Sequence, residues 1–423
     1  MSDRDVLIVG AGLAGLACAK ELIDSGLSCL VLEGAERVGG RVTTDEVDGF
    51  LLDRGFQVLL SDYPEARRTL DFDALRLRPF DPGGLVRRGG REWRVVDPWR
   101  DPARGMLTLR APFVSLADGM RMARLRGEAL AGRPGGSDAT ALEHLRSRGF
   151  SEPLLESFFR PFFGGVMLDR ELGAPAWYLL ALFGWFARGS AVLPERGMRA
   201  LPEQLAGGLP DGTLHLATPV ASVAPDGVEL ESGERLSARE VVVATDASAA
   251  ARLLGRPATT GWSGTTTLYY AAERSPVGAP MLVLNGDGPG AGPVNHLCVL
   301  SDAQPSYAPA GAVLVSVSVN GVPDEADEAL DAAVRAQLTG WYGAAVAGWR
   351  HLRTDRIPHA LPRAFTRPDA PVASEPITVC GDHVATPSIQ GALGSGRRAA
   401  EHVVARLVGS GRVTTPAGSG PGG

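Results

Sequence analysis

A glycine-rich turn between an apolar strand and a helix constrains the fold of this chain more than any other feature. Val6-Leu7-Ile8-Val9 is a short, continuously apolar run, typical of a strand buried on both faces. Gly10-Ala11-Gly12-Leu13-Ala14-Gly15 follows directly and opens a helix expected over 13–23, and a second buried strand is expected over 29–32. Strand, glycine turn, helix and strand within about 30 residues predict a βαβ unit with parallel strands.

The three glycines have the spacing that a dinucleotide-binding turn requires. Gly10 allows the tight turn, Gly12 lets the backbone approach a pyrophosphate, and Gly15 lets the helix lie close to the strand. The phosphates then lie at a helix N-terminus, here opened by Leu13 and Ala14, where unpaired N–H groups and the helix dipole favour anions. The sequence therefore predicts a dinucleotide site at this turn.

An acidic residue at the end of the second strand marks the ribose side of this site. Glu33 follows Gly15 by 18 residues, well placed to accept hydrogen bonds from ribose hydroxyls. Its negative charge disfavours a 2′-phosphate, so NADP fits poorly. In an ordinary nicotinamide-binding domain the chain would simply enter the next helix at this point.

The chain continues instead into a second glycine pair, within Gly34-Ala35-Glu36-Arg37-Val38-Gly39-Gly40-Arg41. Gly39 and Gly40 permit close backbone approach, and Arg37 and Arg41 can face a phosphate or an electron-rich ring. This Gly-Gly-Arg extension resembles the signature of flavin amine oxidases, phytoene desaturases and protoporphyrinogen oxidases. The following segment, 49–55, is similar to the one that returns the chain beneath the flavin in that family, although Asp53 by itself would be interpreted as a turn residue.

The resemblance continues at the far end of the chain. A buried strand expected over 377–380 delivers Gly381-Asp382, whose carboxylate can accept hydrogen bonds from ribityl hydroxyls. The helix that opens near Ser388-Ile389-Gln390 can direct its N–H groups at the N1/C2 carbonyl edge of the flavin, which stabilises reduced flavin. The family also implies that Val220 contacts the adenine through its backbone. Two such motifs more than 300 residues apart, in the right order, indicate FAD as the cofactor.

The expected fold class is α/β, and it contains two domains. A Rossmann-like, discontinuous FAD-binding domain is expected to combine segments 1–75, 196–255 and 371–409, and a substrate domain to combine 76–195 and 256–370 in a mixed sheet with helices. Residues 410–423 are rich in Gly, Ser, Pro and Thr, which predicts a disordered tail.

The sequence also predicts strands and helices within the substrate domain. Residues 265–271 and 312–319 alternate between apolar and polar side chains, which predicts a sheet covered on one face. Residues 116–130 and 327–341 have helical periodicity. The strongly aromatic segments Phe158–Phe163 and Trp177–Phe186 are candidates to hold an apolar substrate, or else form the core of a helical subdomain.

By this resemblance the chain is an FAD-dependent oxidoreductase of the desaturase-like branch. A substrate C–H bond would deliver hydride to flavin N5, giving a C=C or C=N bond, and oxygen, a quinone or another acceptor would restore the flavin. An apolar substrate such as a terpenoid is preferred, with the flavin ring at the domain interface beneath the aromatic segments. A flavin-dependent amine oxidase and a non-redox flavin isomerase are the alternatives.

The chain departs from the amine oxidases in its lysine content. Many of those enzymes use a lysine to hold a water near flavin N5, whereas the single lysine here, Lys20, lies in the first helix. The histidines His296, His359 and His383 are candidate acid–base groups, but a lone histidine is more often structural. Hydride removal from an apolar C–H bond needs no acid–base residue, so no catalytic residue is assigned.

Two further classes are weighed against this reading. Proteins that escort prenylated GTPases resemble the same fold without flavin chemistry, but Gly12, Glu33, Arg41 and Asp382 are intact here. A nicotinamide-dependent dehydrogenase would have no use for the C-terminal motif.

Composition narrows the partners and the compartment. A net charge of −6 argues against nucleic acid, and four scattered cysteines support neither a metal site nor a disulfide framework. A strand expected from residue 6 leaves no room for a signal peptide, and the longest uncharged apolar run is shorter than the ~20 residues of a spanning helix. A cytoplasmic protein is expected. Arg121, Arg124 and Arg126 form either a peripheral membrane contact or, as favoured, a solvated helix face.

Overall fold

The computed structural model describes residues 4–132, 139–367 and 376–409, so the tail expected over 410–423 lies outside the described residues. The chain divides into two compact units. The first unit combines residues 1–40, 202–259 and 366–423, and the second combines 41–201 and 260–365. These units are defined by how densely their residues contact one another. The FAD-binding and substrate domains are defined by the ligand they are expected to hold, and their extents stay predictions.

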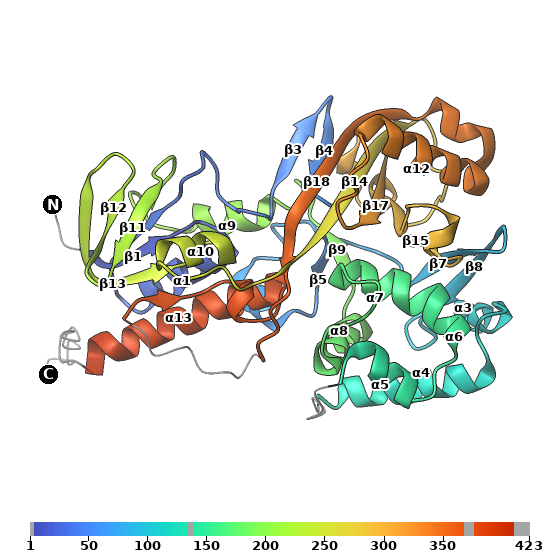
Figure 1. Ribbon diagram of the computed structural model, residues 1–423, viewed down its shortest axis with the longest axis horizontal. Helices are drawn as coiled ribbons and strands as arrows, with labels where there is room; N and C mark the ends of the chain where they lie inside the picture. The colour runs from blue at the N-terminus through green and yellow to red at the C-terminus, as the bar shows by residue number, and fades with distance from the viewer. Residues whose placement is uncertain (1–3, 133–138, 368–375, 410–423) are drawn as a thin grey trace, which may run out of the picture. The chain divides into compact units, whose positions relative to one another are not determined.

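The first unit contains the predicted βαβ element. It consists of β1 (Arg4–Val9), α1 (Leu13–Asp24) and β2 (Cys29–Leu32), and both neighbours of β1 in the sheet, β2 and β13 (Arg235–Val243), run parallel to it. The strand order is β10-β2-β1-β13-β12-β11, with β19 also pairing with β13 (Figure 1). The remaining elements are β10 (Leu214–His215), β11 (Val220–Ala224), β12 (Gly227–Leu230), α10 (Ala247–Leu253), β19 (Thr378–Val379), the 3₁₀ turn η6 (Asp382–Val384) and α13 (Ile389–Gly409). The helix α9 (Ala200–Gly207) begins in the second unit and ends in the first.

Three parallel strands of this sheet end side by side. Val9 of β1 lies opposite Val243 of β13, and Val243 lies opposite Val379 of β19. Parallel strands lie about 4.8 Å apart, so the chain segments that leave β1 and β19 start about 10 Å from each other. The register therefore brings the glycine turn after β1 and the Gly381-Asp382 segment after β19 to one edge of one sheet.

The second unit contains a mixed sheet packed on a helix. Its order is β18-β14-β17-β16-β15-β7-β8, in which only the β15–β7 pair is parallel among the described strands. The strands are β7 (Gly83–Arg88), β8 (Arg91–Val96), β14 (Trp262–Ala272), β15 (Leu282–Asn285), β16 (His296–Val299), β17 (Val313–Asn320) and β18 (Arg350–Pro362). The helix α12 (Asp327–Tyr342) covers one face, where Leu330, Val334 and Leu338 pack with Val315 and Val317 in an apolar core.

The expectation that this sheet is covered on one face is wrong. Residues of β14 and β17 are buried on both sides, including Thr267, Ser316 and Ser318 on the face away from the apolar core. The predicted alternation of apolar and polar residues is present, but the polar face is also enclosed, because the helix over residues 160–167 and the segment that follows Asp53 pack against it. The polar residues of these strands therefore do not face solvent.

Helices make up much of the rest of the second unit (Figure 1). Helix α4 begins where predicted because Ser115 and Asp118 form a capping box at its N-terminus. The helices and turns are α2 (Pro64–Thr69), α3 (Pro102–Gly105), η1 (Met106–Arg110), α4 (Leu116–Leu130), α5 (Ala141–Ser147), α6 (Glu152–Leu154), the π-helical turn η2 (Leu155–Phe159), α7 (Arg160–Met167), α8 (Ala176–Arg188), η3 (Pro289–Ala291), α11 (Leu300–Ala303), η4 (Pro305–Tyr307) and η5 (Gly343–Gly348). Two small sheets contain β3 (Thr44–Val47) with β4 (Phe50–Asp53), and β5 (Leu59–Leu60) and β6 (Arg78–Pro79) with β9 (Ala191–Leu193).

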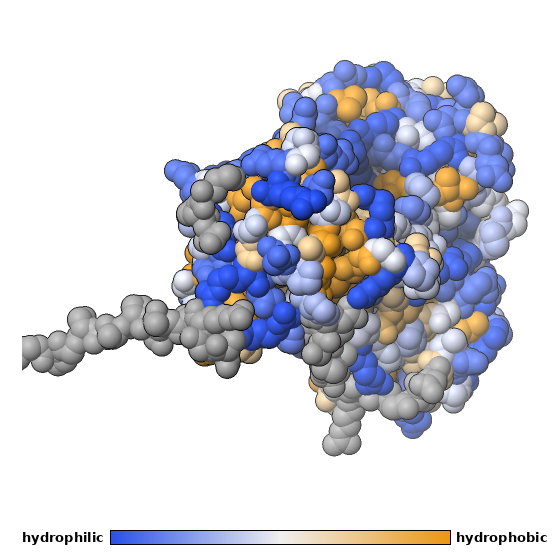
Figure 2. Space-filling model, turned by 60° about the vertical axis from the view of Figure 1, so that its left-hand side comes forward, coloured by the Kyte–Doolittle hydropathy of each residue, from blue (hydrophilic) through white to orange (hydrophobic). Residues whose placement is uncertain are grey.

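The surface is mostly hydrophilic, with hydrophobic residues gathered in patches on the face that Figure 2 shows. In the described part of the chain, no helix has both the length and the apolar character that crossing a membrane requires.

Candidate functional site

The turn after β1 is built so that two of its positions require glycine. Gly10 has φ +107°, and a Cβ there would lie 3.0 Å from the Ala244 carbonyl oxygen. A Cβ on Gly15 would lie 2.0 Å from the Gly10 carbonyl oxygen, well inside contact distance. Helix α1 can therefore start directly over the end of β1 only with glycine at both positions.

The third glycine of the turn faces open space. Gly12 is the N-cap of α1, and a Cβ there would meet no atom within 4 Å. No side chain caps the helix, and its first turn, which Leu13 and Ala14 open, contains no acidic residue. The N-terminal N–H groups of α1 are thus left for an anion, and the space over Gly12 suits the close approach of a pyrophosphate.

Glu33 and the second glycine pair lie against the same turn. The Glu33 carboxylate accepts hydrogen bonds from the backbone N–H of Ala11 (2.7 Å) and of Ala35 (2.9 Å). Gly39 bridges to Gly12, and a Cβ on Gly40 would lie 3.9 Å from the Gly12 Cα. Residues that the sequence placed together by spacing alone are therefore neighbours.

The C-terminal motif lies in the same unit and packs on α1. The Gly381 N–H donates to the Ser395 hydroxyl of α13 (2.9 Å), and Gly381 has φ +146°. Asp382 follows at the start of η6 and is buried. A Cβ on Gly396 of α13 would lie 2.1 Å from the Ala14 carbonyl oxygen of α1, so the two helices touch through backbone. Front and rear motifs thus meet in one unit.

The remaining predicted cofactor residues divide between the units. Val220 is the buried first residue of β11, and Ile389 is the first residue of α13, whose first turn is capped by the Ser388 hydroxyl accepting from the Gly391 N–H (3.0 Å). Arg41 belongs to the second unit, where its guanidinium donates to the Ala360 carbonyl (2.9 Å) and lies over the Trp262 ring.

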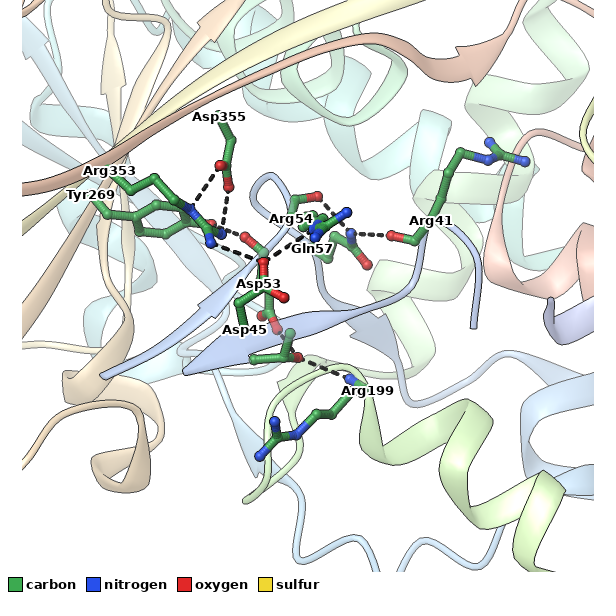
Figure 3. Close-up of polar contacts among 10 residues, drawn as sticks. Arg41, Asp45, Asp53, Arg54, Gln57, Arg199, Tyr269, Arg353 and Asp355 are labelled. Atoms are coloured by element: carbon green, nitrogen blue, oxygen red, sulfur yellow. Dashed lines mark hydrogen bonds and ion pairs between the residues drawn. The ribbon is translucent and has the colours of Figure 1, made fainter. Parts of the chain in front are cut away.

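A buried carboxylate is the centre of a polar cluster in the second unit (Figure 3). Asp53, at the end of β4, accepts from the Thr44 hydroxyl (2.5 Å), the Met198 N–H (3.0 Å) and the Tyr307 hydroxyl (2.9 Å). Its backbone carbonyl accepts from the Tyr269 hydroxyl (2.6 Å). Burial raises the pKa of Asp53 to about 6, although these hydrogen bonds oppose the rise. The interpretation of Asp53 as a turn residue is wrong, because a fully bonded carboxylate ends a buried strand.

Ion pairs surround this cluster and extend toward Arg41 (Figure 3). Asp45 pairs with Arg54 (3.1 Å) and Arg353 (2.9 Å), and Arg353 also pairs with Asp355. The Gln57 amide donates to the backbone carbonyls of Arg54 and of Arg41, each at 2.9 Å. The segment after β4 is thereby fixed in place by side chains from both sides.

The second unit also contains a large apolar cavity of about 620 Å³. The predicted aromatic segments supply part of its wall, through Phe158, Phe162, Phe163, Phe183 and Phe186. These rings pack on one another, as in the stacked pair Phe158 and Phe162, whose centroids are 5.4 Å apart. The aromatic region thus forms a core and also lines a cavity, while its role in holding an apolar substrate stays a prediction.

Sequence reasoning missed the opposite wall of the cavity. It comes from β8 and the segment 97–123, with Trp99, Met106, Leu116 and Met120 among its residues. Leu116 and Met120 are four residues apart on α4, which is a signal of one apolar helix face. From the sequence, only the arginines of that helix were considered as candidates for a surface contact.

The charged residues of the cavity wall have polar partners in the protein, although the arginine nearest to Asp81, Arg104, is 3.9 Å away. Arg126 pairs with Asp97 (2.8 Å), and its guanidinium also donates to the Ala187 carbonyl. Asp118 accepts from Ser115 and Ser151. Burial would raise the Asp118 pKa, but these hydrogen bonds outweigh it and hold the pKa below its usual range. The cavity therefore offers apolar surface and few uncommitted charges.

Comparisons with known proteins agree with this architecture. A family model described as flavin containing amine oxidoreductase matches residues 13–404. Putrescine oxidase from Kocuria rosea is 44% identical over 69 residues, which are 16% of this chain and 14% of that protein. Protoporphyrinogen oxidase 2, chloroplastic/mitochondrial, from Arabidopsis thaliana is 27% identical over 174 residues, or 39% of this chain and 33% of that protein.

The likeness in structure extends much further than these local alignments. Wild-type putrescine oxidase bound to putrescine superposes with a TM-score of 0.69 at 18% identity, covering 96% of this chain and 100% of that chain. Identity at this level shows a shared fold. The alignments to the two curated relatives above span no more than a third of either protein.

Proposed function

This chain belongs to the flavin-containing amine oxidoreductase family, and on that premise we propose that it uses FAD to oxidise an apolar substrate held in the cavity of the second unit. The expected cofactor, FAD, and the expected enzyme class, an FAD-dependent oxidoreductase, are those of the family. The desaturase-like preference within the family, with a terpenoid as the example substrate, is the finer part of the proposal.

The residues of the first unit fit the cofactor. The open space over Gly12, the uncapped N-terminus of α1 and the Glu33 carboxylate suit the pyrophosphate and ribose, and Asp382 suits the ribityl chain. FAD, when bound, accepts a hydride from a substrate C–H bond. The chain's own contribution is to hold the cofactor and to exclude water from the substrate.

The cavity is the observation that carries the choice of substrate class. A volume of about 620 Å³ lined by phenylalanine and aliphatic side chains binds hydrocarbon through apolar burial. Two of its three carboxylates, Asp97 and Asp118, are engaged in short ion pairs or hydrogen bonds, and the third, Asp81, lies 3.9 Å from Arg104, so an ammonium group would have to compete with these partners. These features favour an apolar substrate over an amine.

The single lysine supports the same choice. The Lys20 ammonium lies on the exposed surface of α1, where it pairs with Asp24 at 2.6 Å. It is therefore committed to a surface ion pair, and the water-holding role that a lysine has in many amine oxidases has no candidate here.

The test is an anaerobic titration of the FAD-loaded protein with a diterpene hydrocarbon in detergent and, separately, with putrescine. We expect the flavin absorbance to bleach with the hydrocarbon and to stay unchanged with putrescine. Bleaching by putrescine alone would make the protein an amine oxidase, and conversion of the hydrocarbon without bleaching would make it an isomerase. A protein that stays colourless after incubation with FAD contradicts the proposal altogether.

The mouth of the cavity also supports peripheral contact with a membrane. Met106, Leu116 and Met120 line the cavity yet are 76%, 73% and 63% exposed. Residues 102–127 contain five arginines and one aspartate, in a chain of net charge −6. An exposed apolar rim with excess positive charge suits an anionic lipid surface, from which an apolar substrate could enter.

Vesicle co-sedimentation tests this contact. We expect the protein to sediment with phosphatidylglycerol vesicles at low salt, and to lose binding when Met106, Leu116 and Met120 are all changed to Asp. The matched control is Val408→Asp, since Val408 is 55% exposed on α13 in the other unit. Equal sedimentation of the triple variant and the wild type would contradict the contact. The four cysteines are free and buried, which fits the proposed cytoplasmic location.

A further inference from the structure

Three polar side chains line up across the second sheet, on the face away from its apolar core. Thr267 of β14 lies opposite Ser318 of β17, and Ser318 lies opposite His296 of β16. Residues directly opposite one another on neighbouring strands point to the same face, with Cβ atoms about 5 Å apart. We call Thr267, Ser318 and His296 the polar row.

The polar row is buried and lacks protein partners. The three residues are 0%, 3% and 5% exposed. Within the described chain, the Thr267 hydroxyl, the Ser318 hydroxyl and the His296 Nε2 have no hydrogen-bond partner. Buried polar groups in folded proteins are nearly always paired, because an unpaired one destabilises the fold. Three such groups on one row call for a partner from outside the chain, either a water or an atom of a ligand.

The neighbours of His296 determine what this partner can be. The Asn295 amide oxygen accepts from Arg170 (3.0 Å) and its nitrogen donates to the Pro161 carbonyl (2.9 Å), which fixes the amide orientation. The same nitrogen lies 3.1 Å from His296 Nδ1, so Nδ1 accepts and Nε2 carries the proton. Burial lowers the pKa of His296 to about 4, so the ring is neutral. The row therefore offers one N–H donor and two hydroxyls, without charge.

None of the three row residues lines the apolar cavity, but the row and the cavity share neighbours. The Phe56 ring lines the cavity and also meets the His296 ring edge-on, with centroids 5.1 Å apart. Helix α7 contributes Phe162, Phe163 and Val166 to the cavity, while a Cβ on its Gly165 would lie only 3.1 Å from His296 Nδ1. The same ring and the same helix thus border the cavity and the row.

We propose that the polar row binds a neutral, oxygen-bearing end group of the substrate, an alcohol or a carbonyl, while the hydrocarbon part fills the cavity. The inference rests on the proposed function and narrows its substrate class from an apolar molecule to an amphipathic one. A hydroxyl or carbonyl oxygen accepts from the His296 N–H and exchanges hydrogen bonds with Thr267 and Ser318. An ammonium group would face that N–H and is disfavoured.

The experiment compares two probes of equal length on the full-length, FAD-supplemented protein. Binding of a diterpene alcohol and of the matching diterpene hydrocarbon is followed by tryptophan fluorescence, without turnover. We expect the wild type to bind the alcohol about tenfold more tightly, the factor that corresponds to 1.4 kcal/mol. Thr267→Val and Ser318→Ala should abolish this preference and leave the affinity for the hydrocarbon unchanged.

The matched control is the neighbouring residue on the same strand. Thr266 is 0% exposed like Thr267, but it points to the opposite face and its hydroxyl donates to the Gly321 carbonyl (3.0 Å). Thr266→Val should lower the melting temperature and keep the tenfold preference, whereas Thr267→Val should keep the melting temperature and lose the preference.

The outcomes separate this inference from the proposed function. Equal affinity of the wild type for the two probes overturns the inference, even if the hydrocarbon is oxidised. A lower melting temperature of Thr267→Val, with the preference for the alcohol intact, would show that the row holds only structural water. That result would also overturn the inference. Failure of the protein to bind FAD would overturn the proposed function. The relative affinity for the alcohol and the hydrocarbon would still test whether the polar row binds an end group.

Discussion

The two proposed ligand sites are built on the two large sheets in different ways. The parallel sheet of the first unit uses its strand ends, where the turn with Gly10 and Gly12 and the segment with Gly381 start from one edge. The mixed sheet of the second unit uses a face, where the buried hydroxyls of Thr267 and Ser318 have no hydrogen-bond partner within the described chain. Sites made of backbone depend on glycine at fixed local spacing, and a sequence displays them. Sites made of side chains depend on strand register, which a sequence does not display.

The largest expected effect tests the backbone-built site. Gly15→Ala should destabilise the protein by about 3 kcal/mol or more, because its Cβ would lie 2.0 Å from a backbone oxygen. Gly12→Ala is the control, since its Cβ meets no atom within 4 Å; loss of the N-cap glycine should cost only about 0.5–1 kcal/mol of stability while FAD affinity falls. Thermal melting and FAD titration measure the two effects. Equal stability of the two variants would remove the distinction between the glycines.

A pH-dependent effect of comparable or smaller size, opposite in sign in the two units, concerns the buried Asp53 and the partly buried Asp5. The pKa of Asp53 rises on folding from its ordinary value to about 6, so the folded state holds the proton more tightly and its stability falls as pH rises through that interval. Asp53→Asn removes this dependence and should gain about 3 kcal/mol relative to wild type between about pH 4 and pH 7. Urea unfolding at several pH values measures it.

Asp5 of the first unit is the opposite case. Burial alone would raise its pKa, but hydrogen bonds from Ser28 and Arg239 outweigh burial and lower it. Its ionised form therefore stabilises the fold above its unfolded pKa, and Asp5→Asn should lose stability relative to wild type as pH rises from acid. The same slope in both variants would contradict the assignment of these two environments.

The smallest expected effect concerns Lys20. Its ion pair with Asp24 is exposed, and such pairs contribute about 0–1 kcal/mol. Lys20→Ala should therefore leave FAD binding and substrate oxidation unchanged and shift the melting temperature by no more than a degree or two. A large loss of activity would show that the lysine has a role that its position on α1 does not suggest.

The sequence predicted the first unit well because its signals are local. The strand over 29–32 has the predicted bounds, and the neighbourhood of Gly12, Glu33 and Gly40 followed from spacing. Asp53 was misread because its partners, Thr44, Met198 and Tyr307, come from separate parts of the chain. His296 was treated as a structural histidine for the same reason, since its opposite neighbour Ser318 is a residue of the next strand and only the register pairs them.

The order of strands in the first sheet has a consequence for biosynthesis. Strand β1 leaves the ribosome among the first residues, but β13 is made more than 200 residues later and β19 more than 350 residues later. At about 5–20 residues per second, a nascent chain spends tens of seconds with the edge of β1 unpaired. Loading of the coenzyme must therefore wait until translation is nearly finished, and during that interval the exposed apolar strand is a natural substrate for chaperones.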